Sequence, residues 1–312
     1  MADRKKSFVV AGAVFGVGVL LVVAALLKVP VGYGPGGALC FLGLLLFGLS
    51  FIPRGAPAAG EEPPPMSFPQ KLAAIFFEPS SVFRNLRWHP RWLAALLLIS
   101  LLGFAYTTAF TQRLTPERIV NFTTDKVVER FPNIPPEQAA RMREQGIEDA
   151  KAPGKVAGSA VTAFVGAFVF TCIFAGLYML AVLLFGGRLG FWQAFAMAVW
   201  ASVPVAIIGR VLSLVLLYVK DPDDIHPVRG QGGLVTDNLS VLVNAADHPV
   251  LFSVLSGLGL LAFYHLWLTA TGLRHTSDKL GSSSAWTIAI IFWLLGLLLA
   301  AAVSALFGNF IS

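Results

Sequence analysis

Long apolar stretches alternate with short polar or proline-rich stretches along the whole chain. A helix rises about 1.5 Å per residue, so roughly 20 mostly apolar residues cross the hydrocarbon core of a bilayer. The pattern therefore predicts an all-α fold, a polytopic membrane helical bundle of about seven transmembrane helices. The apolar runs expected to form them are residues 8–27, 37–52, 93–110, 156–185, 191–218, 250–271 and 285–306.

Composition agrees with a membrane protein. The mean hydropathy is +0.74. Of all residues, 56% are hydrophobic and only 13% are charged, which excludes an ordinary soluble globular chain. The net charge of +6 comes from basic residues at span ends and in loops, where they face anionic lipid head groups. Because no basic patch is interleaved with aromatic residues, membrane lipids rather than nucleic acid are the expected partners.

A proline-rich linker separates the first two spans from the rest of the chain. The stretch RGAPAAGEEPPPM, residues 54–66, has too few apolar residues to bury a core and is expected to be semi-extended. Residues 1–66 are therefore predicted to form an N-terminal transmembrane hairpin with its linker, and residues 67–312 a five-span membrane domain. The first apolar run is followed by Lys28 and Pro30 rather than by a small-residue cleavage site, so we interpret it as a retained span.

The segment 67–92 mixes apolar and basic residues and is too polar to cross the membrane. It is predicted to be an interfacial amphipathic helix that lies flat on the cytoplasmic surface, with Arg84, Arg87 and Arg91 directed toward lipid phosphates. Two prolines interrupt the segment. They leave open, on equal terms, an alternative in which the segment packs beneath the bundle.

The distribution of basic residues predicts the orientation of the chain. Basic residues before the first span, between residues 54 and 91, and in the connections near residues 188 and 274–279 all fall on one side. Since basic loops stay in the cytoplasm, the N-terminus is predicted to be cytoplasmic and the C-terminus external. The polar segment 111–155 is then an external insertion, with two helical stretches divided by prolines.

Two residues of the fifth span, Pro204 and Arg210, break its apolar pattern. Pro204 removes one backbone N–H and is expected to kink the helix. Arg210 is the only Lys, Arg, Asp or Glu expected in the interior of a span, and such charges are often functional because hydrocarbon does not solvate them. The favoured interpretation is an anchor, because Arg210 is close enough to the outer end of its span to extend toward water.

His265 is the other titratable residue expected within the membrane. Its span runs in the opposite direction, so His265 is predicted near the cytoplasmic side and Arg210 near the external side, without contact between them. A satisfied interhelical residue is favoured over a role in proton transfer or ligand binding. A Ser202–His265 dyad stays open, although nothing in the sequence positions it.

The sequence carries no recognisable catalytic or cofactor motif. A nucleophile elbow, HExxH, paired intramembrane aspartates, a P-loop and a Rossmann pattern are all absent. The loop DPDDIH, residues 221–226, contains carboxylates and a histidine, but its spacing matches neither an EF-hand nor a zinc motif, so a solvated loop is favoured. We therefore expect a non-enzymatic protein without a cofactor or a bound metal.

The chain contains four stretches, FFEPSSVFRNL, AFAMAVWASVP, DPDDIHP followed by TDNL, and LWLTATGLRHTS. Together they resemble the bacterial branch of the Yip1 family, whose common core has five spans. The resemblance covers about residues 67–312, whereas the first two spans and segment 111–155 are additions to a minimal member. It implies no catalytic residue. Eukaryotic members are associated with Rab GTPases and vesicle traffic, but their Asp-Leu-Tyr-Gly-Pro stretch is absent here, so that role is not implied.

Two functions follow from these expectations. The first is a non-enzymatic integral protein of a bacterial cytoplasmic (inner) membrane that organises lipids or protein partners, including further copies of itself, through segments 67–92 and 111–155. The alternative is a transporter, channel or lipid-flipping protein built around the kink at Pro204, since broken helices expose backbone dipoles at mid-membrane. The lack of intramembrane acidic residues and of visible inverted repeats favours the first function.

Overall fold

The computed structural model describes residues 2–27, 33–52, 62–245 and 247–307. Within these ranges the chain forms α-helices and short 3-10 helices, and its only β-pairings are two isolated bridges. Part of the predicted connector after the first span and most of the predicted linker lie outside the described residues. The prediction of an all-α membrane bundle is confirmed.

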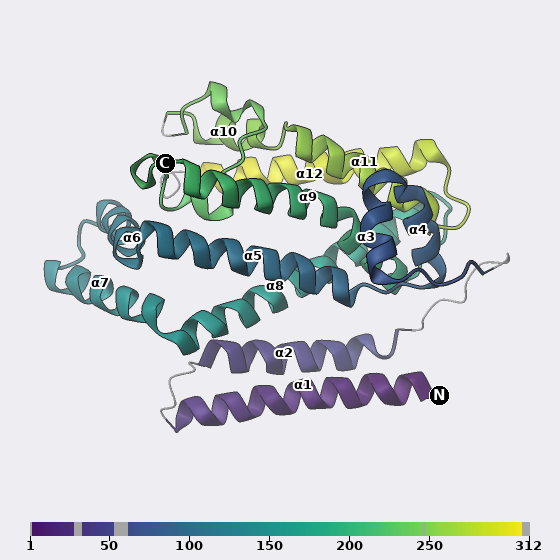
Figure 1. Cartoon of the computed structure of the whole chain (residues 1–312), viewed down its shortest axis with the longest axis horizontal. Coiled ribbons are helices and arrows are strands. Elements are labelled where there is room, and N and C mark those ends of the chain that lie inside the picture. The colour runs from purple at the N-terminus through teal and green to yellow at the C-terminus, as the bar shows by residue number, and fades with distance from the viewer. Residues whose placement is uncertain (1, 28–32, 53–61, 246, 308–312) are drawn as a thin grey trace.

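Long apolar helices lie roughly side by side along the length of the molecule (Figure 1). Five of the described helices are long and apolar enough to cross a membrane on their own, which makes the chain a multi-pass membrane protein. The shorter α2 (Tyr33–Leu49) completes the predicted N-terminal pair. The five long helices are α1 (Ala2–Leu26), α5 (Leu93–Leu114), α8 (Pro153–Leu184), α9 (Phe191–Val219) and α12 (Ser282–Phe307).

The sixth predicted span is not one helix. Instead of a continuous helix over residues 250–271, the structure has α10 (Pro249–Ser256) and α11 (Leu260–Thr276), with Gly257 and Gly259 in the break. Glycine weakens a helix by about 1 kcal/mol relative to alanine. Asp237 stabilises the new helix start, because its carboxylate accepts a hydrogen bond from the Leu261 N–H at 2.6 Å. The prediction of a single sixth span is wrong, since counting apolar residues does not detect this glycine break.

The first two helices pack closely against each other. α1 contacts α2, and α2 in turn contacts α8, so α1 is the outermost helix on this side of the bundle (Figure 1). A side-chain carbon built on Gly43 would lie 2.7 Å from the backbone nitrogen of Phe15. Glycine therefore lets the two backbones approach at this point, as in other small-residue helix pairs in membranes.

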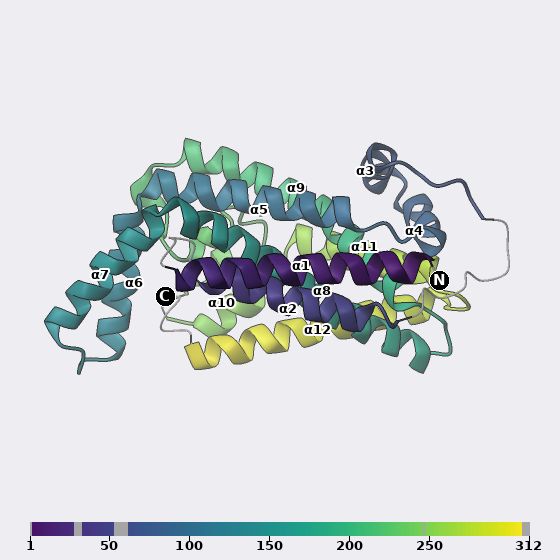
Figure 2. The ribbon, with the colours of Figure 1, turned by 90° about the horizontal axis from the view of Figure 1, so that it is seen from below.

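Short helices close the two ends of the bundle (Figures 1 and 2). At the end where α1 begins lies the α3–α4 cap, made of α3 (Phe68–Phe77) and α4 (Pro79–Trp88). At the opposite end, where α12 finishes, lies the α6–α7 hairpin, made of α6 (Pro116–Arg130) and α7 (Pro136–Lys151). The first and last spans thus start and finish at opposite ends, as an odd number of crossings requires.

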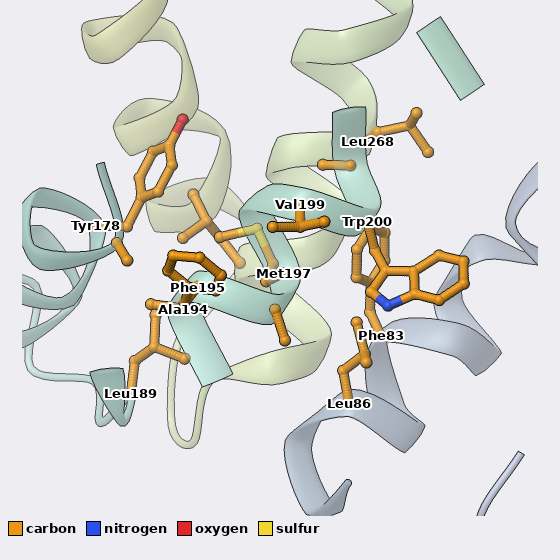
Figure 3. Packing of buried hydrophobic residues seen from close by; sticks show 14 of the residues in the cluster. Phe83, Leu86, Tyr178, Leu189, Ala194, Phe195, Met197, Val199, Trp200 and Leu268 are labelled. Carbon is orange, nitrogen blue, oxygen red and sulfur yellow. The ribbon is translucent and has the colours of Figure 1, made fainter. Parts of the chain in front are cut away.

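The α3–α4 cap packs against the bundle through an apolar face. The side chains of Ile75, Phe83 and Leu86 are fully buried, and α4 contacts both α11 and α9. Figure 3 shows Phe83 and Leu86 beside Trp200 of α9. The cap therefore packs on the end of the bundle. This agrees with the alternative that segment 67–92 packs beneath the bundle.

One aspartate joins three parts of the cap end. The backbone of Asp278, in the turn before α12, pairs with the backbone of Arg188 in the turn before α9, with N–O distances of 2.8 and 2.9 Å. The carboxylate of Asp278 also accepts a hydrogen bond from the Arg87 guanidinium of α4 at 2.9 Å. Both charged side chains are largely shielded from solvent, so the pair fixes α4 onto the two turns.

Lys71 of α3 is a buried cation, with only 2% of its surface exposed. Its ammonium group donates a hydrogen bond to the carbonyl of His89 at 3.3 Å. Burial, together with the nearby Arg91, lowers the pKa of Lys71 from 10.5 to about 8. Between these two pH values the unfolded chain binds more protons than the folded chain, so stability rises with pH in this window and is constant outside it.

We expect the melting temperature of the detergent-solubilised chain to rise by a few degrees between pH about 8 and pH about 10. In Lys71→Met, which keeps a similar length without the charge, this rise should be absent. Lys220→Met is the matched control, because Lys220 is exposed and its loss should leave the rise unchanged. Melting curves across this pH range check the prediction, and an equal rise in Lys71→Met would contradict it.

Candidate intramembrane binding site

A cavity of about 780 Å³ lies within the bundle, between α5, α8, α9 and α11. Small residues face it from three of these helices, among them Gly103 of α5, Ala163 of α8 and Ala206 of α9. Because such side chains do not fill the space between neighbouring helices, the local sequence leaves this volume open. The cavity is partly open to its surroundings, and most of its wall is apolar.

Ser202 of α9 and His265 of α11 form a polar pair on the cavity wall. The Ser202 hydroxyl lies 3.4 Å from Nε2 of His265, and it also donates a hydrogen bond to the carbonyl of Ala198 at 3.0 Å. A hydroxyl has one hydrogen, so a Ser202 that donates to Ala198 accepts from an Nε2–H of His265. A nucleophilic serine would need the reverse, with the imidazole accepting its proton. The structure thus brings Ser202 and His265 together, and the pair joins α9 to α11.

Arg210 of α9 also lines the cavity. Its guanidinium donates a hydrogen bond to the carbonyl of Gly232 at 2.8 Å and lies over the ring of Tyr106 on α5, with its central carbon 5.2 Å from the ring centre. Within the described chain, no carboxylate lies within ion-pair distance of Arg210. The described partners of this charge are therefore a backbone carbonyl and an aromatic ring, neither of which carries an opposite charge.

The loop between α9 and α10 folds back to reach Arg210. This 220–248 loop contains the short helix η2 (Arg229–Gly232), whose Gly230 carbonyl accepts a hydrogen bond from the Tyr106 hydroxyl. Ser213 of α9 accepts a hydrogen bond from the Leu234 N–H at 3.0 Å. Between these contacts Gly233 has a φ of +138°, a backbone conformation that side chains rarely adopt, and a side-chain carbon there would lie 3.8 Å from the Arg210 guanidinium. The loop thus forms one end of the cavity.

Arg210 and His265 lie on the wall of one cavity, although their predicted depths placed them near opposite faces of the membrane. Among the described contacts, none joins the two side chains directly. Ser202, the neighbour of His265, lies two turns before Arg210 on α9, roughly 12 Å along the helix axis. The site therefore has a cationic end at Arg210 and the Ser202–His265 polar pair farther along.

Pro204 lies inside α9, which continues through it as one helix. The proline ring is buried in the helix packing and is not part of the cavity wall. Its missing N–H removes one hydrogen bond from the helix, next to the cavity-lining residues Ser202 and Val205. Pro204 therefore borders the site without contributing a group to it.

The three arginines predicted to face lipid phosphates have different surroundings. The guanidinium of Arg87 forms an ion pair with Asp278. Arg84 is exposed and lies 3.8 Å from Glu78, while Arg91 is exposed and offers its carbonyl to the indole N–H of Trp200 at 2.9 Å. Of the three guanidinium groups predicted to face lipid phosphates, those of Arg84 and Arg91 remain accessible.

The acidic loop DPDDIH fastens the α6–α7 hairpin to the bundle. Arg118 of α6 donates hydrogen bonds to Asp223 at 3.1 Å and to the Pro222 carbonyl at 2.7 Å.

Nδ1 of His226 accepts from the N–H groups of Val228 and Arg229, both at 3.2 Å. Burial, reinforced by Arg229, lowers the pKa of His226 to about 4, which suits a neutral acceptor. In the described ranges, no group of three potential metal ligands comes together.

The fold and the cavity define a multi-pass helical membrane protein with a partly open cavity between its helices. A family model, the Yip1 domain, matches residues 73–303, which is more than half of the chain. The chain belongs to the Yip1 family, and the resemblance found in its sequence is confirmed at the level of the family. No curated protein and no solved structure matches the chain.

Proposed function

We propose that this Yip1-family protein is a non-enzymatic membrane protein that binds an amphiphile of the lipid class in the cavity between α5, α8, α9 and α11. The observation that carries the proposal is the placement of an arginine that has no acidic partner among the described residues, in a cavity whose remaining wall is mostly apolar. An amphiphile offers a polar group to such an arginine and hydrocarbon to such a wall.

The size of the cavity supports this proposal. Small-molecule pockets measure roughly 300–1,000 Å³, and the volume of about 780 Å³ falls within that range. Apolar side chains from three helices, Ile99, Phe164 and Leu261, line it. A water-filled pore for small ions would instead favour a wall of polar groups along its full length.

The non-enzymatic part of the proposal rests on the Ser202–His265 pair and on the charge of the cavity. The serine hydroxyl is directed to a backbone carbonyl, and the cavity wall includes no acidic residue that could orient the imidazole. General acid–base chemistry needs such a positioned group. The proposed location is the cytoplasmic membrane of a bacterium, with the N-terminus inside and the C-terminus outside, as the distribution of basic residues indicates.

One observation favours lipid transfer across the bilayer as a second candidate function. The sixth span is broken between α10 and α11, and α11 contributes Leu261 and His265 to the cavity. Discontinuous helices at a mid-membrane site are a feature of many transporters. A liposome assay of lipid flipping distinguishes transfer from simple binding.

We expect a double substitution that fills the cavity, Ala163→Phe with Ala206→Phe, to reduce lipid bound to the purified chain at least tenfold. Both alanines line the cavity, and the two rings would occupy the space of a hydrocarbon chain. Lipid that remains bound after detergent exchange is measured by native mass spectrometry.

The matched control is Leu212→Phe with Val215→Phe on the same helix α9. These two residues are exposed, at 46% and 55%, and lie outside the cavity. Lipid binding should persist in this control. Equal lipid binding by the cavity-filled and control chains would show that the cavity is not the binding site.

A further inference from the structure

We propose that the amphiphile carries an anionic head group, a phosphodiester or a carboxylate, and that the Arg210 guanidinium binds it. This inference rests on the proposed function and names the ligand class for the same cavity. It also assigns Arg210 a role beyond that of an anchor at the end of its span.

The charge of the cavity is the first argument. Among the described residues, its wall includes one Arg and no Asp or Glu. Elsewhere in the described chain several arginines have acidic partners: Arg87 pairs with Asp278, Arg118 with Asp223, and Arg143 with Asp125. Arg210 has a backbone carbonyl and an aromatic face instead. In a medium of low dielectric constant, an anionic ligand would supply the missing opposite charge.

The geometry of the guanidinium is the second argument. An arginine has five N–H donors arranged as a planar fork that matches the oxygens of a carboxylate or phosphate. In the described contacts Gly232 accepts from one of them, while the Tyr106 ring covers the face of the plane rather than its donor edge. Tyr106 is itself held by its hydrogen bond to Gly230. The fork is therefore fixed from two sides and keeps donors for a ligand.

The position of Arg210 in the cavity fixes how the amphiphile lies. Arg210 is next to the 220–248 loop, at one end, and the apolar side chains of Ile99 and Phe164 belong to the same cavity. A head group bound at Arg210 places its hydrocarbon chain along α9 toward Ser202, roughly 12 Å away. The Ser202 hydroxyl is already in contact with the Ala198 carbonyl and with His265.

The test uses the full chain in lipid nanodiscs that contain phosphatidylglycerol and phosphatidylcholine with identical acyl chains. We expect the wild-type chain to retain phosphatidylglycerol over phosphatidylcholine by about tenfold or more, as a charge-assisted hydrogen bond allows. Arg210→Gln should abolish this preference and Arg210→Lys should keep most of it, because lysine retains the charge. Bound lipid is identified by native mass spectrometry.

Two outcomes separate this inference from the proposed function. If Arg210→Gln retains the full preference for phosphatidylglycerol while the cavity-filled chain loses both lipids, the cavity binds lipid but Arg210 does not select it, and the inference fails. If the cavity-filled chain binds lipid normally, the proposed function itself fails. The surface control Arg130→Gln should leave the preference unchanged, since Arg130 is exposed at the end of α6 and lies outside the cavity.

A second measurement identifies the source of the anion and does not depend on a stable variant. Inorganic phosphate in excess should not displace phosphatidylglycerol from the wild-type chain, and displacement would assign the site to a free anion instead. A photoactivatable phosphatidylglycerol should label the stretches 99–107 and 159–167 of the wild-type chain, which contain the α5 and α8 residues that line the cavity. Labelling confined to the outer surfaces of α1 and α12 would overturn the inference.

Discussion

Alanine in place of Phe83 should lower the free energy of unfolding by about 3–5 kcal/mol, because the substitution deletes a buried ring and leaves a cavity. Phe83 has no exposed surface and lies where α4 meets α9 and α11, beside Met197 and Gly272. The α3–α4 cap should detach from the bundle at a lower temperature or denaturant concentration than in the wild type. Chemical unfolding in detergent, followed by tryptophan fluorescence, measures the change, since Trp200 lies in the same cluster.

Phe77 provides a matched control for Phe83. It is the same residue type in the same cap, but 89% of its surface is exposed. Phe77→Ala should change stability by less than about 0.5 kcal/mol. Similar losses for the two variants would mean that the cap is not packed on the bundle as described.

Valine in place of Gly43 should separate α1 from α2. Any side chain at this position meets the backbone nitrogen and Cα of Phe15, at 2.7 and 2.8 Å, and backbone atoms cannot rotate away as a flexible side chain can. Overpacking of this kind costs about 1–3 kcal/mol. The open form of the pair should therefore become roughly tenfold more populated, or more.

Cys40 of α2 reports this opening, because its thiol lies against the carbonyl of Phe15 on α1. With Cys172 replaced by alanine, labelling of Cys40 by N-ethylmaleimide should accelerate in Gly43→Val. Gly48→Val on the same helix is the control, since a side chain at Gly48 meets no atom within 4 Å. Unchanged labelling of Cys40 in Gly43→Val would contradict close packing of the pair.

The spans were predictable because hydrophobic length is a local property of the sequence. The fifth span was predicted over residues 191–218, and α9 runs over Phe191–Val219. The break in the sixth span could not be predicted in this way, because it depends on a distant residue. Asp237 accepts the hydrogen bond that stabilises the start of α11 at Leu260. An apolar run with two glycines is compatible with either arrangement until that contact is known.

The same break explains why the cavity could not be predicted. The depth of His265 was counted along a straight helix from residue 250, whereas α11 begins at Leu260 and extends to Thr276. His265 therefore lies nearer the start of its helix than the count implied, on the same cavity as Arg210. Arg210 itself could be singled out, since its charge stands alone in an apolar run. The contacts of Arg210 with Gly232 and Tyr106 could not be predicted, because they depend on how the 220–248 loop folds back onto the bundle.

The Arg87–Asp278 contact has a consequence for the synthesis of the chain. The two residues are 191 positions apart, and the face of Phe83 packs against α11, which is also made late. The cap is therefore synthesised long before the helices against which it packs, and its apolar face stays unburied until α9 and α11 have been made. The Arg87–Asp278 contact forms only after the turn before α12 has been made, so it joins one of the last segments of the chain to one that was translated much earlier.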